Sequence, residues 1–94
     1  MNLSEMTAIV AEINRALDER IQWVEDHDSM REHGAIAHTG RVLQNDGGGW
    51  IFTLVEFPIE DKIAVRGTAV RLGMIVNLPP ALAEKALMRA RSLT

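Results

Sequence analysis

The stretch that decides the fold is apolar at all but two positions and reads Trp50-Ile51-Phe52-Thr53-Leu54-Val55-Glu56-Phe57. Aromatic and β-branched residues at this density are typical of a β-strand. Successive side chains of a strand point to opposite faces of the sheet, so each face receives large apolar groups. One face receives Trp50, Phe52 and Leu54, and the other receives Ile51, Val55 and Phe57. A strand covered on one side alternates more cleanly than this, so both faces need an apolar covering.

The residues before this strand predict a long amphipathic helix from about residue 3 to about residue 26. Its apolar residues recur at steps of three or four and form one buried stripe, namely Leu3, Met6, Val10, Ile13, Leu17, Ile21 and Val24. Asn2 and Glu5 have the spacing of a capping box at the start of the helix. Gly34 is a natural stop, which leaves room for one or two further turns through Met30 and Arg31.

From residue 35 the hydrophobic period changes to that of a sheet. Ala35–Gln44 and the strand at residues 50–57 form a hairpin, because Asn45-Asp46-Gly47-Gly48-Gly49 between them is a turn cluster. After a corner at residues 58–61, two further strands are predicted at Lys62–Thr68 and Ala69–Asn77. These runs predict a small antiparallel sheet of three to four strands that is either open or barrel-like.

The chain ends in a second, shorter helix. Pro80 suits the first turn of a helix, and Ala81–Ser92 carries leucines and alanines on one side. The sequence therefore predicts one α+β domain over residues 1–94, with a long N-terminal amphipathic helix, the small sheet and this short C-terminal helix.

Composition places the chain among ordinary globular proteins, with 47% apolar and 24% charged residues in 94. There is no cysteine, which excludes disulfides and thiolate chemistry. Because neither a bilayer-spanning run nor a secretion signal is visible, we expect a cytoplasmic protein without a membrane partner. Residues 1–34 hold eight acids against three arginines, and residues 35–94 hold seven bases against five acids. This is no large basic field for nucleic acid.

The two apolar faces of the strand at residues 50–57 predict a partner. Helices on opposite faces of the sheet, closure into a barrel, or a second subunit would each cover both faces. The C-terminal helix offers a narrow covering, and an exposed apolar patch usually marks an interface. A two-fold dimer hides one patch on both subunits at once. We therefore expect a homodimer that uses the sheet face or the long helix.

Two candidate sites for ions have the wrong spacing. An acidic and histidine-rich segment comprises Glu25, Asp26, His27, Asp28, Glu32, His33 and His38. His27 and His33 are six residues apart and fall on different sides of a helix, so we predict no metal site here. Gly47-Gly48-Gly49 is followed by a strand and by no Gly-Lys-Ser/Thr, which favours a hairpin tip over a phosphate cradle.

Two binding sites remain as alternatives. A pocket between helix and sheet would be lined by Trp50, Phe52 and Met74 and would hold a small ligand. A basic set near the aromatics would bind single-stranded nucleic acid weakly, and it comprises Arg41, Lys62, Arg66 and Arg71. Nucleic acid is the less favoured partner, because aromatic residues make up only 4% of the chain.

No catalytic constellation is present. The chain has neither cysteine nor tyrosine and no Gly-x-Ser-x-Gly, and Thr39 beside His38 has no third orienting group. The sequence therefore favours a non-catalytic protein without a cofactor over an enzyme. We expect a small protein-interaction or regulatory protein that acts as a homo-oligomer, either an accessory factor or a mobile-element protein.

Overall fold

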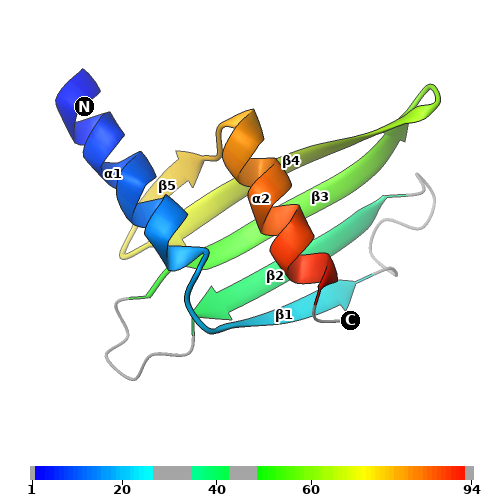
Figure 1. Ribbon diagram of the computed structural model, residues 1–94, viewed down its shortest axis with the longest axis horizontal. Helices are drawn as coiled ribbons and strands as arrows, with labels where there is room; N and C mark the ends of the chain where they lie inside the picture. The colour runs from blue at the N-terminus through cyan, green and yellow to red at the C-terminus, as the bar shows by residue number, and fades with distance from the viewer. Residues whose placement is uncertain (1, 27–34, 43–48, 93–94) are drawn as a thin grey trace.

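The computed structural model describes residues 2–26, 35–42 and 49–92 and contains two helices and five strands in these ranges. In chain order, the elements are α1 (Leu3–Ala16), β1 (Ile21–Asp26), β2 (Ile36–Val42), β3 (Ile51–Ile59), β4 (Lys62–Arg71), β5 (Met74–Asn77) and α2 (Pro80–Arg91). The predicted α+β class is confirmed (Figure 1). Neither described helix is long and apolar enough to cross a bilayer.

The sheet is an open antiparallel meander in which each strand pairs with its neighbours in sequence. Its strand order is β1-β2-β3-β4-β5, so β1 and β5 are the edges. The predictions of three to four strands and of a barrel-like sheet are therefore wrong. The last two strands divide at Leu72-Gly73, where both residues have positive φ, and not at Thr68 as predicted. The predicted turn at residues 45–48 lies outside the described residues.

The predicted N-terminal helix is too long, because α1 ends at Ala16 and Ile21–Asp26 forms the edge strand β1. Ile21 and Val24 continue the helical stripe in sequence, but they also lie in a short run rich in β-branched and aromatic residues. Pairing with β2 selects the extended form, with Ile21 opposite Val42 and Val24 opposite Thr39. The predicted extension through Met30 and Arg31 lies outside the described residues.

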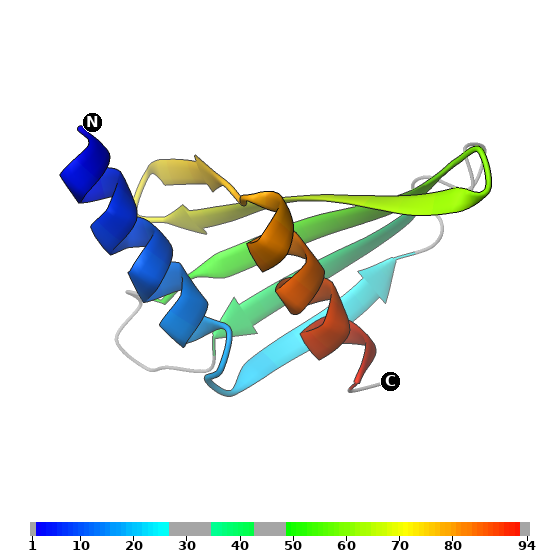
Figure 2. The same cartoon turned by 45° about the horizontal axis from the view of Figure 1, so that its top comes forward.

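Both helices lie over the same face of the sheet, as Figures 1 and 2 show from two directions. We call this the covered face. Its strand residues pack against Ile13 and Leu17 of the α1 segment and against Leu82, Ala86 and Leu87 of α2. The buried strand side chains of the covered face are Ile21, Val42, Trp50, Phe52, Leu54, Ala69 and Val76. Two of the three expected coverings, helices on opposite faces and a closed barrel, are thus excluded.

The apolar stripe of α1 is buried only in part. Ile13 and Leu17 are 0% and 1% exposed, whereas Leu3 and Met6 are 83% and 40% exposed. The N-terminal turns of α1 extend past the edge of the sheet, so no described strand lies beneath them (Figure 2). Asn2 caps α1 as predicted, since its side chain accepts a hydrogen bond from the Glu5 backbone N–H, and the Glu5 carboxylate accepts one from the Asn2 side-chain amide.

Candidate functional site

The face of the sheet opposite the helices has no described helix over it, and we call it the open face. Antiparallel pairing aligns its side chains in rows across the strands. The central row is Val24, Thr39, Thr53, Thr68 and Asn77. The row on one side of it is Gln22, Arg41, Ile51, Val70 and Ile75. On the other side, Val55 lies between Ala37 and Arg66, and the next row pairs Phe57 with Ala64.

Large apolar side chains on the open face reach solvent. Ile75 is 72% exposed and Val24 is 59% exposed, while Val55, Phe57 and Val70 are half-buried. Half of the strand positions on the open face are β-branched residues, whose side chains are restricted to few rotamers. The open face thus carries apolar side chains on either side of a central row that contains three threonine hydroxyl groups.

Three of the four predicted nucleic-acid contacts share the open face. Arg41, Lys62 and Arg66 alternate with covered-face residues, and the Arg66 guanidinium lies 5.6 Å from the centre of the Phe57 ring. Arg71 lies instead on the covered face, where it pairs with Glu12 of α1 and lies over the Trp50 ring. Among the strand positions described, Asp26 is the acid whose register assigns it to the open face.

The residues predicted to line a ligand pocket lie on the covered face. Trp50 and Phe52 are 4% and 0% exposed and fill the core, and Met74 lies near the start of the edge strand β5. Phe52 stacks on Trp23 with ring centroids 6.2 Å apart. Trp23 in turn lies against Gly40, since a Cβ atom there would come within 2.6 Å of the indole ring. Trp50 and Phe52 thus serve packing, and the predicted ligand pocket remains a prediction.

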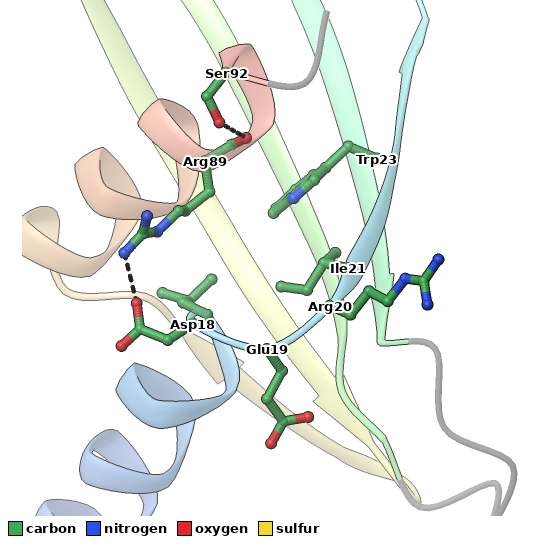
Figure 3. Close-up of a pocket in the computed structure, with 8 residues that line it drawn as sticks. Asp18, Glu19, Arg20, Ile21, Trp23, Arg89 and Ser92 are labelled. Carbon is green, nitrogen blue, oxygen red and sulfur yellow. Dashed lines mark hydrogen bonds and ion pairs between the residues drawn. The ribbon is translucent and has the colours of Figure 1, made fainter.

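A cavity of about 420 Å³ opens between the α1–β1 turn and the last turn of α2 (Figure 3). Trp23 and Ile21 form its apolar wall, and Arg20 points away from it. Across its mouth, Asp18 accepts hydrogen bonds from Lys85 at 3.1 Å and from Arg89 at 2.6 Å. The hydrogen bond from Lys85 is the main cause that lowers the pKa of Asp18. These charged groups already pair with one another, so we assign them to a contact between the end of α1 and α2 rather than to ligand binding in the cavity.

A chain of hydrogen-bonded side chains, with its two sheet members buried, joins α2 to the sheet. His38 and Glu56 are 3% and 5% exposed, and the His38 Nε2 atom lies 2.5 Å from a Glu56 carboxylate oxygen. The other carboxylate oxygen accepts a hydrogen bond from Arg91, in the last turn of α2. Sequence reasoning missed this chain. The available signal was Glu56 itself, a lone charge at the same strand parity as Phe52 and Leu54.

The candidate catalytic pair does not assemble. Thr39 lies on the open face, whereas the neighbouring His38 points into the core of the covered face. Within residues 2–26, 35–42 and 49–92, no three histidine, aspartate or glutamate side chains gather as they would around a metal ion. His27, Asp28, Glu32 and His33 of the acidic segment lie outside the described residues. Comparison with family models, curated proteins and solved structures finds no match.

Proposed function

We propose that this chain is a small non-catalytic interaction protein of the cytoplasm that acts as a homodimer, with the open face of its sheet as the interface. One observation carries the proposal. Both helices lie on the covered face, and the apolar side chains of the open face have no described helix over them. A second copy of the same face is the simplest partner surface, since one patch then serves both subunits.

The energy available favours association. Burial of a large apolar side chain contributes about 1.5–3 kcal/mol relative to leaving it exposed. Ile51, Val55, Phe57, Val70 and Ile75 together form a patch of the kind that marks interfaces. The area of the open face on one subunit follows from five strands spaced about 4.8 Å apart, with about three side-chain positions of 6.8 Å along each strand. This gives roughly 500 Å² if the unevenness of the side chains is left out. This is small for a specific interface, so we expect a dimer that dissociates on dilution.

The chemistry of the described polar groups supports a non-catalytic role. The one buried histidine of this part of the chain is engaged by Glu56, and Glu56 also accepts a hydrogen bond from Arg91. The hydroxyl nearest to His38 in sequence, Thr39, lies on the other side of the sheet. This pairing ties α2 to β2 and β3, which is a structural task.

The dimer is tested by placing a charge at the centre of the open face. Thr53→Arg should keep the fold, because Thr53 is exposed, but should prevent association by placing two like charges together. Glu84→Arg is the matched control on the outer side of α2. In light scattering across a dilution series, the mass of the wild type and of the control should fall from twice 10.4 kDa toward 10.4 kDa as the protein is diluted, and Thr53→Arg should stay at 10.4 kDa throughout. A wild type that stays at 10.4 kDa at every concentration excludes the proposal.

A second candidate function is favoured by the three cations of the open face. Arg41, Lys62 and Arg66 would contact phosphates, and Phe57 offers one ring for base stacking. The remaining aromatic rings, Trp23, Trp50 and Phe52, face the helices. Fluorescence anisotropy with a labelled single-stranded oligonucleotide tests this function. Binding that weakens steeply with salt and is lost in Arg66→Gln would establish it, and no binding at low salt would exclude it.

A further inference from the structure

We infer that the two-fold axis of the homodimer runs along the row Thr39, Thr53 and Thr68. Each of these threonines then faces its own copy, and Thr53 lies at the middle of the interface. This inference rests on the proposed function and specifies how the second copy is seated. Thr53 lies on β3, the middle strand of five, and pairs with Thr39 on one side and Thr68 on the other. It therefore occupies the geometric centre of the open face.

A residue on a two-fold axis meets its own copy, so its side chain must be complementary to itself. A threonine hydroxyl satisfies this condition, because it donates one hydrogen bond and also accepts. Arginine and lysine only donate, and their copies repel each other. Threonine is also small, so the two sheets approach closely along this row, and facing threonines form favourable cross-strand contacts within sheets. Of the rows on the open face, the threonine row is the one that fits the axis.

The rows on either side support the same axis. A rotation about the threonine row carries Ile51 over Val55 of the partner subunit, so that apolar side chains cover each other. The same rotation carries Arg41 over Ala37 of the partner subunit and Arg66 over Val70 of the partner subunit. Each arginine then lies about 13 Å from its own copy, which is four residues along a strand and beyond the Debye length of about 8 Å. No arginine is brought onto its own copy, and Arg41 lies two strands, about 10 Å, from Arg66 of the partner subunit.

The axis is tested by single-cysteine cross-linking, which is clean here because the chain has no cysteine of its own. Facing sheets are about 10 Å apart, beyond the usual reach of a disulfide, so a short bis-maleimide is the suitable reagent. Thr53→Cys should give a covalent dimer, and Thr68→Cys should do so as well. Ile75→Cys is the control, since it is 72% exposed on the same face but off the axis. We expect it to cross-link at least about tenfold more slowly.

A fourth variant, Ile51→Cys, fixes the direction of the axis. An axis along β3 would bring Ile51 onto its own copy, whereas the threonine row separates the two copies of Ile51 by about 13 Å. Rapid cross-linking of Ile51→Cys without that of Thr68→Cys overturns the inferred axis. So does a wild type of doubled mass in which Thr53→Cys reacts no faster than Ile75→Cys, and in this case the dimer itself stands. A monomeric wild type removes both the axis and the proposed function.

Discussion

The two faces of the sheet are formed by alternate residues of the same strands, yet the side chains on them differ in size and arrangement. The covered face is uneven, because its glycines leave space that neighbouring bulky side chains fill. A Cβ atom on Gly40 would come within 2.6 Å of the Trp23 ring, and one on Gly67 within 2.6 Å of Leu54. On the open face, by contrast, β-branched residues flank the row of Thr39, Thr53 and Thr68. The covered face packs against the two helices of its own chain, and the open face is the surface that we propose as the interface with a second copy.

The comparison is sharpest for the two phenylalanines of β3. Phe52 lies on the covered face with 0% exposure, and Phe57 lies half-buried on the open face. Phe52→Ala should lower the free energy of unfolding by about 3–5 kcal/mol, because it removes apolar contacts and leaves a cavity. Phe57→Ala should cost less than about 2 kcal/mol in a dilute, monomeric sample, where the ring already touches water. Chemical denaturation of both variants measures the difference.

Protein concentration distinguishes the two faces further. If the open face is a dimer interface, the cost of Phe57→Ala should grow as the concentration rises, since association stabilises the wild type by mass action. The increment caused by Phe52→Ala, whose ring lies inside one subunit, should grow less. Equal costs for the two variants at every concentration would mean that the two faces do not differ in the way described.

A smaller effect on the free energy of unfolding is expected at His38 and Thr39, neighbours in β2 whose side chains point to opposite faces of the sheet. His38→Ala should cost about 1–3 kcal/mol, because the buried Glu56 carboxylate loses one of its two hydrogen-bond partners. Thr39→Ala is the matched control and should change the monomer by less than about 0.5 kcal/mol. Urea denaturation at low protein concentration tests the pair. A loss for Thr39→Ala as large as that for His38→Ala would contradict the assignment of faces.

The apolar pattern of residues 50–57 correctly predicted a strand with large apolar groups on both faces, but not that both helices lie over the same face. Ile21 and Val24 satisfy both a helical step from Leu17 and a place in a strand, so periodicity alone extended the helix too far. Pairing of Ile21 with Val42, 21 residues away in sequence, selects the strand. In the same way, Glu56 is an evident lone charge, but its partners His38 and Arg91 lie 18 and 35 residues from it. Such contacts are set by tertiary structure.

The smallest expected effect concerns the contact between the two helices at Asp18, and pH reveals it. The Lys85 and Arg89 side chains lower the pKa of Asp18 in the folded chain, with the hydrogen bond from Lys85 as the largest cause. The folded state therefore holds the Asp18 proton less tightly than the unfolded state does. The resulting stabilisation is present above the unfolded pKa of about 3.9 and is lost as the pH falls through the folded pKa. Asp18→Asn should thus be less stable than the wild type near neutral pH, and the difference should shrink below about pH 4.

Glu84→Gln is the control for this experiment, because it also removes an exposed carboxylate but leaves the contact between the helices intact. Added salt should also reduce the effect of Asp18→Asn, since the Asp18 side chain is 53% exposed and exposed ion pairs are screened. The measurement is the urea midpoint of the three proteins across the acidic range. A gap between Asp18→Asn and the wild type that stays constant down to the lowest pH would show that the charge of Asp18 does not hold the helices together. The helices would then be held to the covered face by their apolar packing and by the contacts of Glu12 with Arg71 and of Arg91 with Glu56.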